Sequence, residues 1–379
     1  MTRSSYLRHL ALVGVASLAL AACTNTGEDE PTEDNAAGAD SGTEESAEAG
    51  GDSGDSGGDG AAQTVREPEG AAGEGCTIDQ YGVDPLELEG ATVGFSQSEP
   101  DTAAFRAAET ESIREAAEEI GVGELIVTNA NNELPKQISD IQDMLNQGVE
   151  FLIVAPVNSD GLDPALTAAK DAGVPVLTID RKVTNESCSD YIAFLGSDFY
   201  DQGERAADAM NEATGGEGKV AILLGSSGNN VTDNRNAGFK DKVASDYPGL
   251  EIVAEQTGNF ARDEGQAVTE QLLQSNPDIT AIYAHNDEMG LGAVTAVKAA
   301  GLVPGEDVKI VSIDGTRNAV QGIVDGEINA VIESNPRFGP LAFETAQKFY
   351  DGEAIPEDVI IQDNEYNADN AEANLANAF

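Results

Sequence analysis

The chain has 379 residues, with 69 acidic and 20 basic side chains and a formal net charge of −49. Because a nucleic-acid binder needs a cationic surface to displace counterions from phosphates, this charge excludes DNA and RNA as partners. Tryptophan is absent and only two histidines, His9 and His285, are present, so we expect a mostly aliphatic core and no His-rich metal site.

The first 22 residues have the features of an export signal. Arg3 and Arg8 precede an apolar run over 10–22, which is too short to span a bilayer as a mature helix. The run ends in Leu-Ala-Ala-Cys at Cys23, which resembles the bacterial lipobox. That resemblance implies cleavage before Cys23, acylation of Cys23, and a protein exported to the outer face of the cell membrane and held there by a lipid anchor. An ordinary signal peptide followed by an incidental cysteine is the alternative.

The next segment is expected to be an acidic, disordered tether over residues 23–75. Residues 24–75 contain 15 acids, one base and almost no large apolar side chain. Such a segment cannot bury enough apolar surface to offset the entropy lost on ordering.

Two further cysteines, Cys76 and Cys188, follow the tether. An even pair of cysteines in an exported chain indicates a disulfide, which would pin the start of the folded part to the segment near residue 188. Two unpaired thiols are the alternative, because a sequence does not give the distance between them.

From about residue 90 onward, short apolar strands alternate with helices. Strands are predicted over 91–97, 125–128, 151–154, 174–179, 191–195, 220–224, 251–254, 279–283, 308–313 and 328–332. Three helices between the first strands are predicted to end at 120, 148 and 172. Four more are predicted over 204–210, 232–243, 264–273 and 290–300. A short helix follows 313, and a last helix ends near 350. Apolar strands separated by helices indicate parallel sheets covered on both faces. Ten strands are too many for one small open sheet, so the predicted fold is α/β with two doubly wound parallel-sheet lobes.

Polar side chains recur directly after the predicted strands. In doubly wound sheets, ligands bind beyond the carboxyl ends of the strands. The residues there are Ser96, Gln97, Asp180, Arg181, the 225–230 loop, Asn259, Phe260, Asn286, Asp287, Glu288, Asp314, Ser334 and Asn335. These donors and acceptors suit a neutral polyol, and Phe105 or Phe260 could pack on the C–H face of a sugar. The alternatives are a surface ion pair for Asp180 and Arg181, a helix cap for Asn286, and a core position for Phe105.

Several stretches resemble the sugar-binding proteins of ABC transporters. Ile-Asp-Arg at 179–181, Tyr-Ala-His-Asn-Asp-Glu-Met-Gly-Leu-Gly-Ala at 283–293 and Ser-Ile-Asp-Gly at 312–315 resemble the ribose-binding type. Val-Gly-Phe-Ser-Gln at 93–97 and Phe-Arg-Ala-Ala-Glu-Thr at 105–110 are more similar to the galactofuranose-binding branch. The similarity covers roughly 90–365, while the segment 98–102 differs from that branch in length.

The resemblance implies a type 1 periplasmic binding protein, with two lobes joined by a three-crossing hinge. The implied N-terminal lobe comprises 76–197 plus 335–361, the C-terminal lobe comprises 198–334, and 362–379 forms a C-terminal tail. The implied ligand-binding residues are Ser96, Gln97, Phe105, Arg106, Asp180, Arg181, Arg235, Phe260, Asn286 and Asp314. Phe105 would stack on the sugar, and the arginines would donate to its hydroxyls.

The implied function is capture of a monosaccharide, similar to galactofuranose, galactose or ribose, and its delivery to an ABC transporter permease. A monomer without enzymatic activity, cofactor or metal is expected, because no nucleophile–base pair is visible and the 225–230 loop lacks the phosphate-loop patterns. The alternative is a sugar-sensing co-receptor for a membrane signalling protein. Transcription repressors with this fold carry an N-terminal helix-turn-helix, which the signal and acidic tether exclude. The net charge of −37 on residues 76–379 indicates a saline medium that screens self-repulsion.

Overall fold

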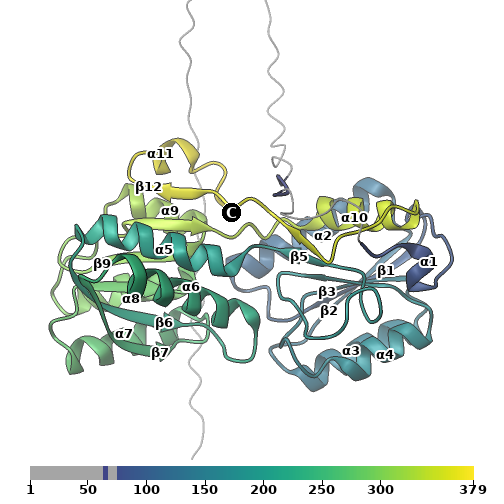
Figure 1. Ribbon diagram of the computed structural model, residues 1–379, viewed down its shortest axis with the longest axis horizontal. Helices are drawn as coiled ribbons and strands as arrows, with labels where there is room; N and C mark the ends of the chain where they lie inside the picture. Colours follow the sequence, from purple (N-terminus) through teal and green to yellow (C-terminus); the bar gives the residue numbers. More distant parts are fainter. Residues whose placement is uncertain (1–62, 67–74) are drawn as a thin grey trace, which may run out of the picture. The chain divides into compact units, whose positions relative to one another are not determined.

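The computed structural model describes residues 63–66 and 75–379, which form two α/β lobes (Figure 1). The predicted export signal, Cys23 and most of the acidic segment 23–75 lie outside the described residues. Each lobe is built on one six-stranded sheet.

The first lobe contains a sheet with the strand order β11-β5-β4-β3-β1-β2, in which all neighbouring strands are parallel. The strands are β1 (Thr92–Gln97), β2 (Glu124–Asn129), β3 (Phe151–Val154), β4 (Val176–Ile179), β5 (Phe194–Gly196) and β11 (Asp358–Ile360). The helices are α1 (Ile78–Tyr81), α2 (Ala104–Ile120), α3 (Leu134–Asn146), α4 (Asp163–Asp171) and α10 (Gly339–Tyr350). The strand order reverses at β1, so the carboxyl end of β1 marks the crevice where a doubly wound sheet binds its ligand.

The second lobe repeats this plan with the order β12-β10-β9-β8-β6-β7. Its strands are β6 (Gly218–Leu224), β7 (Leu250–Thr257), β8 (Ala281–Ala284), β9 (Lys309–Asp314), β10 (Ala330–Glu333) and β12 (Glu365–Asn367). Its helices are α5 (Phe199–Thr214), α6 (Asn230–Asp246), α7 (Arg262–Ser275), α8 (Asp287–Ala299), α9 (Arg317–Val324) and α11 (Ala371–Asn374). The prediction of parallel sheets is confirmed, except that β12 runs antiparallel to β10. Residues 362–379, expected as a C-terminal tail, thus contribute β12 and α11 to this lobe.

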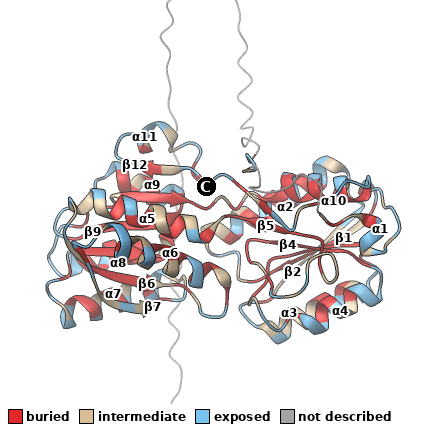
Figure 2. Ribbon diagram, viewed as in Figure 1, coloured by how far each residue is buried: buried red, intermediate tan, exposed pale blue. Residues whose placement is uncertain are grey.

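Both faces of each sheet are apolar. Along β3, Phe151 and Ile153 join one hydrophobic cluster, whereas Leu152 and Val154 join the cluster on the opposite face. The four residues of β8 divide between two clusters in the same alternating way. Figure 2 accordingly shows the central strands as buried. This double burial explains why the strands appear in the sequence as continuous apolar runs.

The chain crosses between the lobes three times, and these crossings define the hinge. The first joins β5 to α5 at 197–198, the second joins β10 to α10 at 334–338, and the third joins β11 to β12 at 361–364. A short segment, 63–66, lies against all three crossings. The Arg66 guanidinium contacts Asp198 at 2.5 Å, the Gln63 side chain donates to the Asn335 carbonyl at 3.1 Å, and Val65 forms an antiparallel bridge with Ile361.

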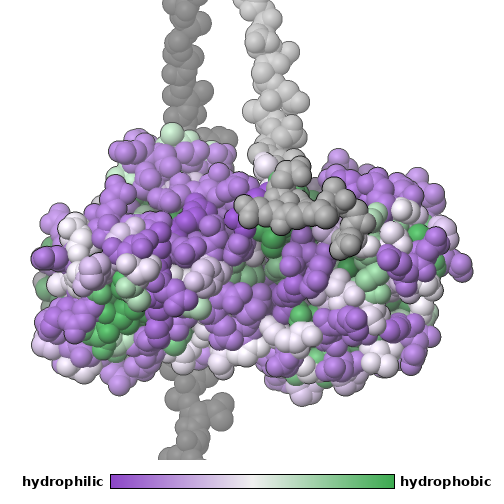
Figure 3. All heavy atoms as spheres, in the orientation of Figure 1, coloured by the Kyte–Doolittle hydropathy of each residue, from purple (hydrophilic) through white to green (hydrophobic). Residues whose placement is uncertain are grey.

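The outer surface is mostly hydrophilic on the face that Figure 3 shows. This agrees with the 54 acids and 17 bases of residues 76–379. Over the residues that the structure describes, no helix combines the length and the apolar character needed to cross a bilayer.

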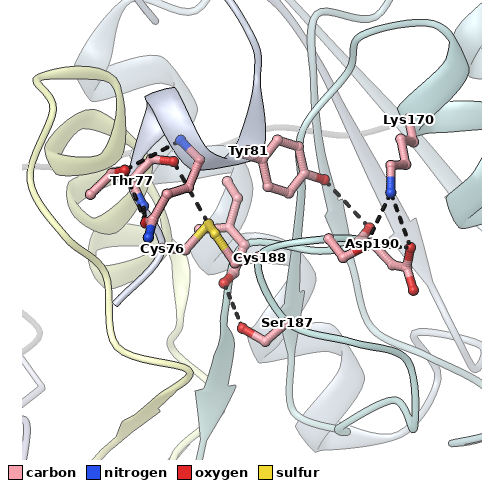
Figure 4. The surroundings of a disulfide bond; sticks show 10 residues. Cys76, Thr77, Tyr81, Lys170, Ser187, Cys188 and Asp190 are labelled. Carbon is pink, nitrogen blue, oxygen red and sulfur yellow. Dashed lines mark hydrogen bonds and ion pairs between the residues drawn. A yellow bond between two sulfur atoms is a disulfide. The ribbon is translucent and has the colours of Figure 1, made fainter. Parts of the chain in front are cut away.

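Cys76 and Cys188 are joined in a disulfide at a sequence separation of 112, as their even number indicates (Figure 4). The backbone of Cys76 also exchanges two hydrogen bonds with Ile355, in the connection between α10 and β11. The beginning of the first lobe is therefore held both to residue 188 and to a segment that returns from the second lobe.

Element boundaries differ from the predicted ones where backbone chemistry decides them. The strand expected from 174 begins at Val176, after Pro175, whose nitrogen cannot donate a hydrogen bond. The helix expected over 204–210 extends to Phe199–Thr214, because the Asp198 side chain caps its first turn by accepting from the Asp201 amide at 3.0 Å. Strands β11 and β12 were not predicted.

Candidate functional site

A cavity lies between the carboxyl ends of the two sheets. It is lined by Glu99, Ala103, Phe105, Arg106, Asp180, Arg181, Val231, Arg235, Phe260, Asn286, Glu288, Asp314 and Thr316. Eight of the ten expected ligand-binding residues are among them. Ser96 and Gln97 are not, because their side chains are buried behind the cavity wall: Ser96 contacts Gln137, and Gln97 donates to Glu109 at 2.8 Å.

The first lobe contributes a network of two arginines and two acids. Glu99 accepts from Arg106 at 2.9 Å through one carboxylate oxygen and from Arg181 at 2.6 Å through the other. A terminal nitrogen of Arg106 also lies 2.7 Å from a carboxylate oxygen of Asp180. Arg181 donates to the Val157 carbonyl at 3.0 Å, while its buried Nε has no hydrogen-bond partner among the described residues. The two guanidiniums are thus fixed in position, and one retains a free donor.

The second lobe contributes Arg235, Asp314 and Asn286. Arg235, on α6, donates to the His285 carbonyl at 2.6 Å and lies 3.7 Å from Asp314, at the end of β9. Asn286 caps α8 by accepting from the Met289 amide at 3.0 Å, and its amide group donates to the Phe260 carbonyl at 3.1 Å. Asn286 therefore both caps a helix and lines the cavity.

Two aromatic rings face the cavity from opposite lobes. Phe105 lies in the first turn of α2 and packs edge-on against Phe379, with ring centroids 6.0 Å apart. Phe260 follows β7, and the Arg181 guanidinium carbon lies 5.9 Å from its ring centroid. A β-carbon at Gly225 would come within 2.0 Å of the Phe260 ring, so this glycine makes room for the aromatic side chain. The rings can supply apolar contact faces on two sides of a ligand.

Backbone strain is concentrated at the same strand ends. Asp180 has φ of 62°, Asn259 of 53°, Phe260 of 61° and Asp314 of 141°, values that non-glycine residues rarely adopt. Such conformations persist only where the surrounding structure imposes them, and they cluster at ligand sites. Three of these residues, Asp180, Phe260 and Asp314, line the cavity, which marks it as the functional site.

Burial and charge act on the acids of the site in opposite directions. Burial alone would raise the pKa of Glu99, but Arg181 and Arg106 outweigh it and lower that pKa to about 2. For Asp314, burial dominates over Arg235 and raises the pKa well above its usual range. Burial likewise raises the pKa of Glu109, behind Arg106, to about 7. Glu99 therefore stays charged at physiological pH.

The lobes also touch beside the cavity, through residues that adjoin the lining residues Arg181 and Val231 in the sequence. The Ser159 amide donates to the Gly228 carbonyl at 2.9 Å, and the Asn230 amide donates to the Ser159 hydroxyl at 3.1 Å. The Asn230 side chain in turn accepts from the Lys182 amide at 3.0 Å. These contacts hold the two lobes together around the cavity.

The arrangement can exchange hydrogen bonds with a ligand that carries hydroxyl groups. Four acidic side chains and three guanidiniums line the cavity, so acidic and basic groups occur there in nearly equal number. In the part of the chain that the structure describes, no cluster of three or more His, Cys, Asp or Glu side chains could hold a metal ion.

Sequence reasoning missed Glu99 as a lining residue, whereas Glu288 was among the polar residues expected after the strands but not among the implied ligand-binding residues. Glu99 lies two residues beyond β1, in the segment whose length differs from the family it resembles. Its position after a strand was the one available signal. Glu288 pairs with Arg262 at 2.7 Å on the outer side of the cavity.

Comparisons with known proteins agree with this geometry. The sequence profile of the family described as "Periplasmic binding protein domain" matches residues 93–354. The chain is 36% identical over 293 residues to the fructose import binding protein FruE of Bifidobacterium longum. This match covers 76% of this chain and 87% of that protein. It is 34% identical over 270 residues to the galactofuranose-binding protein YtfQ of Escherichia coli, with 70% and 84% covered.

A solved structure from Mycobacterium smegmatis, in complex with β-D-fucofuranose, is similar to this chain with a TM-score of 0.71 and 39% sequence identity. The similarity covers 75% of this chain and 94% of that one.

Proposed function

This chain belongs to the periplasmic binding protein domain family, and from that premise we propose that it captures a monosaccharide outside the cell and delivers it to the permease of an ABC transporter. It acts as a monomeric binding protein and not as an enzyme. The named relatives bind fructose, galactofuranose and fucofuranose. A sugar similar to galactofuranose, galactose or ribose is therefore the proposed ligand.

The observation that carries this proposal is the pairing of three buried arginines with a nearly equal number of acidic side chains around one cavity. An anionic ligand would meet the acids Glu99 and Asp180, and a cationic ligand would meet the guanidiniums. A neutral polyol can use both, since its hydroxyls donate to carboxylates and accept from arginines. The rings of Phe105 and Phe260 would pack on its C–H faces.

Thermal unfolding in the presence of a ligand panel tests the proposal. The panel contains D-galactose, D-fructose, D-ribose, L-arabinose and the methyl galactofuranosides, with amino acids and nucleotides as comparison. A ligand at one hundred times its Kd adds about 2.7 kcal/mol to the free energy of unfolding, which raises Tm measurably. A rise with amino acids or nucleotides but with no sugar would contradict the proposed ligand class. The methyl furanoside and pyranoside of galactose, compared at equal concentration, identify the ring form.

Attachment to the membrane is a second part of the proposal. The lipobox-like end of the segment 1–22 supports cleavage before Cys23 and acylation of Cys23, with residues 23–75 as a tether to the lobes. Metabolic labelling with an alkynyl fatty acid should mark the wild-type chain and not Cys23→Ser. Labelling of Cys23→Ser to the same extent would contradict the anchor.

A further inference from the structure

Gln202 lies behind the cavity wall and connects Arg235 to the hinge. Its side chain is fully buried and does not line the cavity. Its Oε1 accepts from Nε of Arg235 at 2.9 Å. Its amide group donates to Asp363 at 2.8 Å and to the Glu333 carbonyl at 3.2 Å. The same side chain therefore contacts a cavity arginine, the end of β10 before the second crossing, and the third crossing.

Close packing of α5 against α6 brings Gln202 and Arg235 together. A β-carbon at Gly203 would lie 2.4 Å from the Arg235 carbonyl oxygen, and one at Gly238 would lie 2.1 Å from the Tyr200 carbonyl oxygen. Only glycine permits this approach of the two helices at these positions. One turn earlier on α5, the ring of Phe199 lies 5.5 Å from the Arg235 guanidinium carbon. The first turn of α5, which directly follows the first crossing, thus contacts the Arg235 guanidinium through Phe199 and Gln202.

The contact with Gln202 determines which way the Arg235 guanidinium faces. The group is planar, so a hydrogen bond at Nε sets the plane in which the two terminal nitrogens lie. Nη1 is used by the His285 carbonyl at 2.6 Å. Nη2 forms no hydrogen bond within the described residues and is not among their fully buried unpaired polar atoms, so it is the nitrogen that remains available to a ligand in the cavity that Arg235 lines.

Asp363 fixes the other end of Gln202. Its side chain is buried in the third crossing, and one carboxylate oxygen accepts from Gln202. The charged groups that face it are Glu333 from β10 and Arg205 from α5, and the latter donates to the Asp363 carbonyl at 3.1 Å. A half turn of the Gln202 amide about its last side-chain bond would exchange its oxygen and its nitrogen. Because Asp363 accepts from the nitrogen, the amide oxygen is the atom that faces Arg235.

We infer that Gln202, held by Asp363 and the Glu333 carbonyl, is a positioning residue that orients Arg235 toward the sugar and ties that orientation to the hinge. It acts through Arg235 and does not touch the ligand. Since this assignment rests on the proposed function, in which Arg235 contacts the sugar, it is tested both with and without sugar.

The test compares Gln202→Leu with Gln202→Glu in the full chain. Leucine removes all three hydrogen bonds of the side chain, whereas glutamate keeps the acceptor for Arg235. Gln202→Leu should lose about tenfold or more in affinity for the sugar, because a hydrogen bond to a charged group contributes more than one between neutral groups. The affinity is measured by calorimetry with the sugar of the panel that stabilises the wild type. Gln202→Glu should recover part of that loss, since it keeps the acceptor for Arg235 but cannot donate to Asp363 or to the Glu333 carbonyl. Thr269→Val, which removes a buried hydrogen bond within α7, is the matched control and should bind as the wild type does.

A spectroscopic measurement without sugar separates the two proposals. The Nε–H signal of Arg235 in a nitrogen–proton correlation spectrum is identified by its absence from Arg235→Lys. It should be lost or broadened in Gln202→Leu and present in Gln202→Glu. Unchanged affinity of Gln202→Leu, or an equal loss in both variants, would overturn the positioning role. If the wild type binds no sugar, the proposed function fails, and an unchanged Nε–H signal in Gln202→Leu would then overturn the positioning role independently.

A second pair of variants keeps the test decisive if Gln202→Leu does not fold. Asp363→Ala releases the amide of Gln202, whereas Asp363→Asn retains an acceptor for it. The same order of affinities is expected, with alanine weaker than asparagine. Equal affinity of Asp363→Ala and the wild type would show that the hinge does not hold Gln202.

Discussion

Replacing Glu99 by glutamine should destabilise the first lobe strongly and in a pH-dependent way. The Glu99 side chain is 15% exposed and bridges two arginines that are 5% and 2% exposed. Its pKa falls from an ordinary 4.5 to about 2, and each pKa unit corresponds to about 1.4 kcal/mol. The charged form therefore contributes about 3 kcal/mol to the free energy of unfolding near neutral pH.

The sign of the pH dependence follows from the lowered pKa. A carboxyl whose pKa is lower in the folded state stabilises the fold above its unfolded pKa, and this contribution is lost as pH falls from 4.5 through about 2. Urea unfolding followed by far-UV circular dichroism should show the full difference between wild type and Glu99→Gln at pH 7. The difference should be smaller at pH 3.5, with equal m-values for the two proteins.

Glu288→Gln is the matched control for that measurement. Glu288 lines the same cavity, but its partner Arg262 has a side chain that is 46% exposed. Exposed pairs contribute only about 0–1 kcal/mol, so this variant should lose little stability at either pH. An effect of Glu99→Gln no larger than that of Glu288→Gln, or one that is the same at both pH values, would refute the bridging role of Glu99.

Further variants test the rest of the site and the fold. Arg235→Ala should abolish sugar binding because it removes a ligand donor, and it should also lower the ligand-free Tm because the buried partners Gln202 and the His285 carbonyl lose their donor; unchanged calorimetric affinity of the folded variant would show that the site is misplaced. Asn230→Ala should weaken affinity about fivefold, since it removes one hydrogen bond made only when the lobes touch; Asn236→Ala, on the outer side of α6, serves as its control. Cys76→Ala combined with Cys188→Ala should lower the free energy of unfolding by about 2–5 kcal/mol, as expected for a long closed loop, and an unchanged urea midpoint would contradict this. Raising salt from low to molar concentration should raise Tm, because the Debye length falls from about 10 Å at 0.1 M to about 3 Å at 1 M; no rise would contradict self-repulsion among the surface acids.

Most of the fold could be predicted from the sequence because its strands are buried on both faces. Runs such as 151–154 and 220–224 are apolar throughout, and helices with a clear apolar face separate them. Strands β11 and β12 have three residues each, which is too short for any periodicity to be visible. Their places in the sheets depend on pairing with β5 and β10, which are distant in sequence.

The candidate site was predictable where its residues directly follow strands. Asp180, Asn286 and Asp314 occupy positions that any doubly wound sheet brings to one edge. Glu99 and Gln202 could not be assigned in this way. The position of Glu99 depends on the path of the 98–102 segment, and that of Gln202 depends on how closely two glycines allow α5 and α6 to approach. Neither property is a local pattern of residue types.

The attachment of residues 63–66 at the crossings has a mechanical consequence. If the lobes rotate about the crossings, a pull transmitted through Gln63 acts close to the rotation axis, on a short lever arm. Such a force exerts little torque on either lobe, so tension on the preceding chain should hardly change the balance between open and closed lobes. The same tension applied at the far edge of a lobe, for instance near β2 or β7, would act on a long arm and would bias that balance directly.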